Sequence, residues 1–472
     1  MDSLNSFSYK NPYYFVMEAR KLLNDHGYVE FNEEVEWENI PNKFYVVRND
    51  SSLVIVNKHD TSSALIVATH NDSPCLKLKP NTKLSRFGFD QVRAAPYGNV
   101  AYSTWYDRGL TYIGKILTKT IPTPNSTDSK IVSTVVAAAG SAVAIPSLAK
   151  HLGGLQITIN PELHTVPIDS LKVPTSDNQS GQLIRDILSL SGISEKLKKL
   201  DQEWKKSPEY QADIEKNAKT ETEKSNKKSD KSCSYVNDVL HIQPKDLIVD
   251  WDLSLIPSEP TRYIGTGGDM VAGYGIDVLA SAIHSMKSFV EANDPEEGMN
   301  VLAIFDNFQI NSNTRIGAKS TLLTSVFERI GCDSLTWANS RLLTIDNFYA
   351  YNPNEPTRFY NSDSVNAGDG LFIHSEMGRC GSANLNFKSQ LLYLAKKKKI
   401  PLTPSNLPQY FSSSIAQDME TQINIETAIV GIPIIGLKTS RELAFNDDIL
   451  CIQKLVSDYY NHFRSIPAIH DI

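Results

Sequence analysis

Alternating helix and strand patterns occur in two stretches of this chain, and a strand-rich stretch separates them. In the first, an amphipathic helix pattern at residues 13–30 precedes apolar strand patterns that include Leu53–Asn57 and Ala64–Thr69. After Leu247 the alternation returns and continues to a closing helix at Ile449–Phe463. Strands that alternate with helices favour an α/β fold with a mixed central sheet and helices on both faces.

The stretch between them contains β patterns separated by turns, at Asn99–Thr104, Thr111–Thr118 and Lys130–Ala137. We therefore expect residues 86–247 to form a mostly β domain, inserted into an α/β domain made of residues 1–85 and 248–472. Within the insertion, residues 196–232 are dominated by Lys, Glu, Asp and Ser. Such a composition buries too little apolar area to offset the entropy of ordering, which predicts a mobile charged loop.

Composition excludes several classes of protein. The net charge of -7 argues against nucleic-acid binding, which needs a basic surface. The five cysteines are widely spaced, without zinc-finger spacing, so we expect neither a disulfide scaffold nor a zinc finger. There is no apolar run long enough to span a membrane and no secretory signal pattern. These features predict a soluble, cytoplasmic protein without a membrane partner.

Polar residues follow several of the predicted strands. His70 and Asp72 come directly after Ala64–Thr69, and Asp346 follows another short apolar strand pattern. Asp269 lies in a glycine-rich turn; it is equally a candidate helix N-cap, and the turn lacks the spacing of a phosphate-binding loop. One histidine and two aspartates at strand ends offer the nitrogen and oxygen donors of a divalent metal site, with Asp72 orienting the imidazole.

Longer motifs carry a family resemblance. ATHNDSPCLKLKP is close to the motif A-H-T-D-S-P-C-L-K-L-K-P, and YSTWYDRGLTYIGKI is similar to W-x-T-W-F-D-R-D-L-x-x-A-G-R-V. AIFDNFQINSNTRIGAKS stands where the family has A-L-F-D-N-E-E-V-G-S, and TIDNFYAYNPN stands where it has S-A-D-M-A-H-A-V-H-P-N. The chain thus resembles the aspartyl aminopeptidase family of dinuclear zinc peptidases, which includes vacuolar aminopeptidase I.

The resemblance implies roles for individual residues. His70 matches a zinc-ligand histidine, and Asp72 matches its supporting acid. Asp269 is matched to the bridging aspartate and Asp346 to a further metal-binding aspartate. His151 matches a histidine that, in the family, a neighbouring subunit contributes to the active site.

The same resemblance implies that half of the family's dinuclear metal centre is missing from this chain. Phe308 stands at the position of the general base, and Gln309 and Asn446 stand at two ligand positions. Phenylalanine moves no proton, and neutral amides suit Zn²⁺ poorly. We therefore expect an empty second metal site and at most one Zn²⁺, or another divalent metal, at the first.

Two functions remain open. The first is a catalytically inactive or strongly impaired protein that acts as a structural subunit. By resemblance, it self-associates through the inserted domain into a tetrahedral dodecamer, or co-assembles with an active paralogue. The alternative is an active metalloaminopeptidase that removes N-terminal acidic residues from peptides. It would use a single-metal centre, or one rearranged around Asp306, Glu420 or Asp447.

Overall fold

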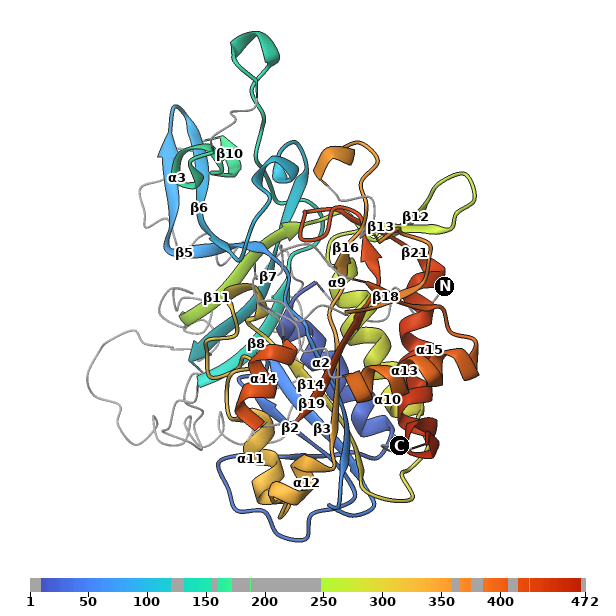
Figure 1. Ribbon diagram of the computed structural model, residues 1–472. Helices are drawn as coiled ribbons and strands as arrows, with labels where there is room; N and C mark the ends of the chain where they lie inside the picture. Colours follow the sequence, from blue (N-terminus) through green and yellow to red (C-terminus); the bar gives the residue numbers. More distant parts are fainter. Residues whose placement is uncertain are drawn as a thin grey trace, which may run out of the picture. The chain divides into compact units, whose positions relative to one another are not determined.

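The computed structural model describes most of the chain and forms two compact units (Figure 1). The described residues are 10–119, 131–154, 159–171, 187, 248–358, 365–374, 385–405, 415–423 and 425–467. Unit 1 consists of Met1–Cys75, Tyr97–Thr104 and Glu259–Ile472, and unit 2 of Leu76–Pro96 and Trp105–Ser258. The predicted charged loop at 196–232 lies outside the described residues.

Unit 1 is built on a nine-stranded mixed sheet. In spatial order its strands are β1 (Val29–Phe31), β2 (Lys43–Arg48), β3 (Ser52–Lys58), β14 (Met299–Phe305), β4 (Ala64–His70), β15 (Arg341–Ile345), β19 (Glu426–Gly431), β17 (Leu371–His374) and β18 (Leu402–Ser405). The central strands β14, β4, β15 and β19 run parallel, whereas β14 is antiparallel to β3. This is the mixed α/β architecture that the sequence predicts.

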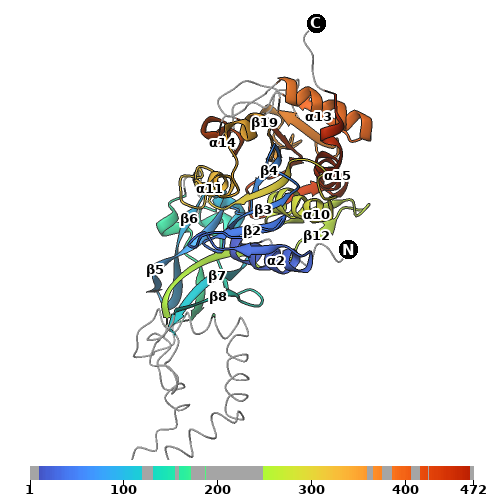
Figure 2. The same ribbon diagram turned by 90° about the horizontal axis from the view of Figure 1, so that it is seen from below.

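Helices cover both faces of this sheet (Figure 2). Apolar side chains alternate along β14, so that Leu302 and Ile304 belong to one core while Val301, Ala303 and Phe305 belong to the other. The first core is completed by α2 (Pro12–Asp25), α10 (His284–Glu291), α13 (Leu385–Lys398) and α15 (Asn446–His462). The second is completed by α11 (Leu322–Arg329) and α14 (Ile415–Ile423). Burial of the central strands on both faces explains why their sequences are almost continuously apolar.

Unit 2 contains a second, seven-stranded sheet. Its strands are, in spatial order, β11 (Ile248–Pro257), β5 (Cys75–Arg86), β6 (Phe89–Tyr97), β10 (Ile168–Leu171), β9 (Val143–Ala144), β7 (Gly109–Lys119) and β8 (Ile131–Ala137). An additional pairing of β11 with β7 joins six of these strands into a ring. Gly114 permits this pairing, because a Cβ at its position would lie 2.0 Å from the Asp252 carbonyl oxygen.

The strand predicted at Asn99–Thr104 is wrong. Residues 99–104 do not form a strand, and Tyr102–Trp105 form a short 3-10 helix instead. The Thr104 hydroxyl and backbone N–H both donate to the carbonyl of Ala101, which closes a turn where the residue pattern resembled a strand. No helix in the described part of the chain is long and apolar enough to cross a membrane.

Candidate functional site

The site lies at the carboxyl ends of three neighbouring parallel strands in unit 1. His70 is the last residue of β4 and pairs in register with Phe305, the last residue of β14. Asp346 directly follows β15, which is also parallel to β4. Because parallel strands end at the same edge of a sheet, this topology brings together the residues that follow each strand. Asp72 and Phe308 reach the same edge from the segments after β4 and β14.

His70 is held between two carboxylates. Its Nδ1 lies 3.0 Å from the Asp72 carbonyl oxygen and 3.5 Å from the Asp72 carboxylate, and its Nε2 lies 3.4 Å from Asp277 Oδ2. The side chain is buried. Burial alone would lower the pKa of His70, but the Asp277 and Asp72 carboxylates outweigh it and hold the pKa well above its usual value. They therefore favour the protonated imidazole, in which both ring nitrogens are donors.

Asp277 lies at the start of α9 (Ile276–Val278) and is buried. Its Oδ1 accepts a hydrogen bond from Asn347 Nδ2 at 2.8 Å. Burial raises the pKa of the Asp277 carboxyl, but its contacts with His70 more than reverse this, so the pKa is lowered.

Asp346 completes the cluster and is the least satisfied member. It is buried, and its Oδ2 has no hydrogen-bond partner within the described part of the structure. Burial and the neighbouring Asp277 charge raise the pKa of the Asp346 carboxyl to about 6, against the opposing charges of His70 and Lys438. A buried carboxylate oxygen is costly unless a proton, a water molecule or a cation satisfies it.

The sequence-based choice of Asp269 differs from this arrangement. Asp269 is exposed, in the turn between β12 (Arg262–Ile264) and β13 (Met270–Gly273), and its carboxylate faces that turn: a Cβ on Gly267 would lie 3.4 Å from Asp269 Oδ1. The contacts described for His70 include Asp277 and not Asp269. The structure thus brings together His70 and Asp277. Asp277 itself was missed, because the glycine-rich turn drew attention to Asp269.

Phe308 fills the place that the resemblance assigns to the general base. It lies in a 3-10 helix at Phe308–Ile310, its side chain is 5% exposed, and its ring stacks on the His70 imidazole with 4.3 Å between centroids. Its backbone N–H donates to Asp72 Oδ1 at 3.2 Å. The residue is therefore part of a packed, hydrogen-bonded wall and offers no group that exchanges protons.

Asp72 is fully engaged by protein donors. Besides Phe308, the backbone N–H of Gln309 donates to Asp72 Oδ2 at 2.9 Å, and the Tyr97 hydroxyl donates to the same oxygen at 2.7 Å. The Gln309 side chain points its amide to the Asp72 carbonyl at 3.3 Å. Asn446, at the start of α15, accepts a hydrogen bond from the Tyr263 hydroxyl at 3.2 Å. The two amides at the positions that the resemblance assigns to metal ligands thus make contacts with the protein.

Other candidates from the sequence lie elsewhere. His151 is exposed in unit 2, in a 3-10 helix at Lys150–Leu152. Asp306 directly follows β14, Glu420 lies in α14, and Asp447 is exposed in the first turn of α15. The described neighbours of the His70 ring are instead Asp72, Asp277 and Phe308.

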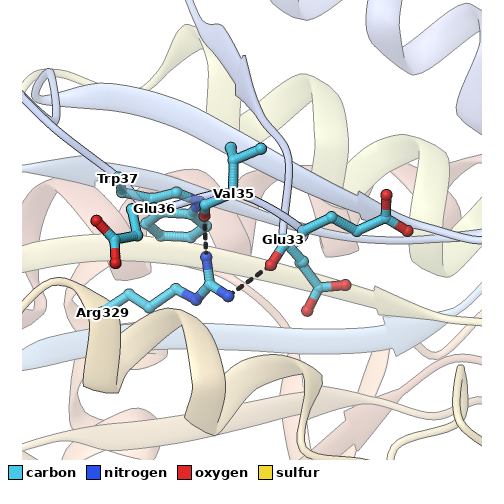
Figure 3. A pocket seen from close by; sticks show the side chains of 6 residues that line it. Glu33, Val35, Glu36, Trp37 and Arg329 are labelled. Atoms are coloured by element: carbon cyan, nitrogen blue, oxygen red, sulfur yellow. Dashed lines mark hydrogen bonds between the residues drawn. The ribbon is translucent and has the colours of Figure 1, made fainter.

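A separate surface pocket involves α11 (Figure 3). It is lined by Glu33, Glu34, Val35, Glu36, Trp37 and Arg329. The Arg329 guanidinium donates to the Val35 carbonyl at 2.8 Å and lies 4.9 Å from the centre of the Trp37 ring. These contacts fasten the loop after β1 to α11, and no residue of the His70 cluster lines the pocket.

These observations define an α/β protein with a buried histidine–carboxylate cluster at the carboxyl ends of parallel strands. The sequence model of the Aminopeptidase I zinc metalloprotease (M18) family matches residues 6–460, so the chain belongs to this family. It is 26% identical to aspartyl aminopeptidase 1 of Schizosaccharomyces pombe, over 96% of this chain and 93% of the relative. It is 23% identical to a probable aspartyl aminopeptidase of Ricinus communis, over 96% and 91%.

Solved structures share the fold. The Ape4 and Nbr1 complex has a TM-score of 0.79 at 22% identity, covering 99% of this chain and 86% of that chain. The S. cerevisiae mApe1 dodecamer has a TM-score of 0.74 at 21% identity, covering 98% and 96%. The match of the family model to residues 6–460 confirms the family that the sequence predicts.

The residues present do not fit a dinuclear zinc centre. His70, Asp277 and Asp346 supply donor types for one metal ion, but Phe308, Gln309 and Asn446 supply none of the anionic or imidazole ligands of a second. In the described ranges, no group of three or more His, Cys, Asp or Glu side chains is arranged to hold a metal ion. No step through a metal pair is derived for this chain.

Proposed function

We propose that this chain is a catalytically inactive or strongly impaired aspartyl aminopeptidase-like protein that serves as a structural subunit of a large oligomer. The observation that carries the proposal is Phe308, buried and stacked on His70 where peptide hydrolysis needs a proton-transferring group. Loss of a positioned general base removes about 10²–10⁴ in rate. Neutral amides at positions 309 and 446 remove further stabilisation of the reacting charge.

The surface of unit 2 supports the assembly part of the proposal. Large apolar side chains are exposed there, among them Phe87 at 98%, Leu152 at 63% and Leu163 at 58%. Leu148 and Leu152 flank His151 in sequence, and both are exposed. Exposed apolar side chains mark protein–protein contacts where they form one contiguous patch. One relative of known structure is a dodecamer, and self-association through unit 2 would bury these side chains and offer His151 to a neighbouring subunit.

Two measurements on the purified full-length chain test this function. Hydrolysis of a peptide with an N-terminal aspartate is expected to stay at background, and native mass spectrometry is expected to show a large multiple of 52.5 kDa. Turnover that disappears in Asp346→Ala would overturn the inactivity. A monomer that also fails to join an active family member on mixing would overturn the structural role.

The alternative is a single-metal aminopeptidase, and one observation favours it. The 3.4 Å between His70 Nε2 and Asp277 Oδ2 is also close to the separation of two ligands on a tetrahedral Zn²⁺ with bonds of about 2.0–2.1 Å. Asp346 Oδ2, which has no hydrogen-bond partner among the described residues, would be the third ligand. One equivalent of tightly held zinc together with turnover would establish this alternative. Zinc without turnover would leave a metal-bound structural subunit.

A further inference from the structure

Lys438 lies above the ring that replaces the general base. It is in the turn between β20 (Pro433–Ile434) and β21 (Glu442–Phe445), in a left-handed backbone conformation with φ of 65°. Its Nζ is 5.3 Å from the centre of the Phe308 ring, whose stacking partner is His70. An ammonium group at this distance from an aromatic ring is attracted to it.

The backbone around Lys438 is fixed to the same acidic cluster. Its N–H donates to Glu442 Oε1 at 2.7 Å, and the other oxygen of Glu442 accepts from the Asp277 N–H at 3.0 Å. Glu442 is buried. One carboxyl group therefore bridges the Lys438 turn and the start of α9, so the position of Lys438 is coupled to that of Asp277.

The cluster contains more acidic than basic groups. Asp72, Asp277, Asp346 and Glu442 are each at most 4% exposed. The positive groups beside these carboxyls are the His70 imidazole, with Nε2 3.4 Å from Asp277 Oδ2, and the Lys438 ammonium over the Phe308 ring. In a dinuclear zinc protein two metal ions supply such positive charge; here two side chains supply it.

We infer that Lys438, which is half-buried, is a counter-ion that replaces metal charge in this centre, so that the fold of the site needs no divalent cation. The inference rests on the proposed function, because a catalytic metal would make the ammonium redundant. It is carried by the placement of Nζ over Phe308, the Glu442 bridge to Asp277, and the misfit of the residues to two zinc ions. Lys438 is thus a positioning residue for a buried acidic cluster that has lost its usual cations.

The experiment compares wild type with Lys438→Met, which removes the charge and keeps the chain length. Lys438→Arg keeps the charge. Lys398→Met is the matched control, because Lys398 pairs with Asp458 at 3.1 Å on α13 and α15. The readouts are zinc content after dialysis against zinc chloride and buffer, and the midpoint of thermal unfolding with EDTA or with zinc chloride.

For wild type we expect a zinc content on the order of background binding, less than about one tenth of an equivalent per chain. We also expect EDTA to leave the midpoint of thermal unfolding unchanged, because no bound ligand then stabilises the folded state. For Lys438→Met we expect a midpoint lowered by about 3–6 °C, from uncompensated buried charge, and partly restored by zinc chloride. Lys438→Arg and Lys398→Met should stay near wild type without a response to zinc.

A wild-type chain that retains one equivalent of zinc and loses stability in EDTA would overturn the inference, even if Lys438→Met fails to fold. So would a Lys438→Met midpoint equal to that of Lys398→Met. These results leave the proposed function intact if the protein is inactive and oligomeric. Peptide turnover by wild type would instead remove the proposed function, whatever the zinc content.

Discussion

Replacing Phe308 by glutamate restores the residue type of a general base and tests whether the site has become a packed core. The ring is 5% exposed and stacks on His70 at 4.3 Å. Losing its burial costs about 1.5–3 kcal/mol, and losing the stacked pair costs about 0.5–1.5 kcal/mol. A carboxylate that joins the buried acids beside it adds about 1–3 kcal/mol, because Lys438 and His70 offset only part of its desolvation.

The sum predicts that Phe308→Glu lowers the free energy of unfolding by about 3–7.5 kcal/mol, or the thermal midpoint by roughly 6–15 °C at ~2 °C per kcal/mol. Phe308→Gln, which has the same shape without the charge, should lose only about 2–4 kcal/mol. Urea unfolding followed by circular dichroism measures both. Turnover of a peptide with an N-terminal aspartate should stay at background in Phe308→Glu, because positions 309 and 446 remain amides.

The difference in stability between Phe308→Glu and Phe308→Gln shows whether the site is a packed core or a cation site. If Phe308→Glu is as stable as wild type, or more stable than Phe308→Gln, then the site accepts a carboxylate and contains more positive charge than His70 and Lys438 provide. That result would indicate a bound cation and would refute the packed-core reasoning. A gain of peptidase activity would refute it as well.

Two further predictions concern buried charge in unit 1. Asp277→Asn removes the partner of a buried protonated imidazole and should lower the free energy of unfolding in urea by about 3–5 kcal/mol. Asp269→Asn, in an exposed turn, should stay within about 0.5 kcal/mol of wild type. Equal effects of the two substitutions would contradict the placement of Asp277. Burial lowers the pKa of His284 to about 4, below its unfolded value, so the unfolded state binds more protons between pH 6.5 and 4. Stability should therefore fall by about 3 kcal/mol as the pH drops through that window. His284→Gln should abolish most of this loss, whereas the same change at the exposed His59 should not.

The central strands were predictable because burial on both faces leaves a local signature. The pattern at Ala64–Thr69 corresponds to β4 within one residue, and the short apolar pattern before Asp346 corresponds to β15. Such strands are short apolar runs, and their carboxyl ends locate polar residues at one edge of the sheet. This reasoning identified His70 and Asp346, which each lie at or directly after such an end.

The remaining residues of the site were not predictable from local pattern. Asp277 contacts His70 because the buried start of α9 places it there. The spacing of Asp277 from the glycine-rich turn does not predict that contact. Lys438 lies 130 positions after Phe308, and a lysine in a turn reads as an ordinary exposed charge. Conversely, the departure of Phe308 and Gln309 from the family motif could be recognised in sequence only through the family resemblance. Composition contains no information about which position a general base occupies.

A substitution at Asp346 distinguishes a centre that is balanced by side chains alone from a centre that binds a metal ion. Asp72 is satisfied by Phe308, Gln309 and Tyr97, but Asp346 retains one oxygen without a described partner. Its pKa is raised to about 6 by burial, above the unfolded value, so its ionised form at pH 7 opposes folding.

If side chains alone balance the cluster, Asp346→Asn removes an unfavourable buried charge. Its free energy of unfolding at pH 7 should then fall by no more than about 1 kcal/mol, and a gain is consistent with the same reasoning. If a metal ion is bound, the substitution deletes a ligand, and stability should drop together with metal content. Urea unfolding of wild type and Asp346→Asn, each with and without EDTA, distinguishes these cases, because only a metal-dependent centre makes the difference between the two proteins disappear on chelation.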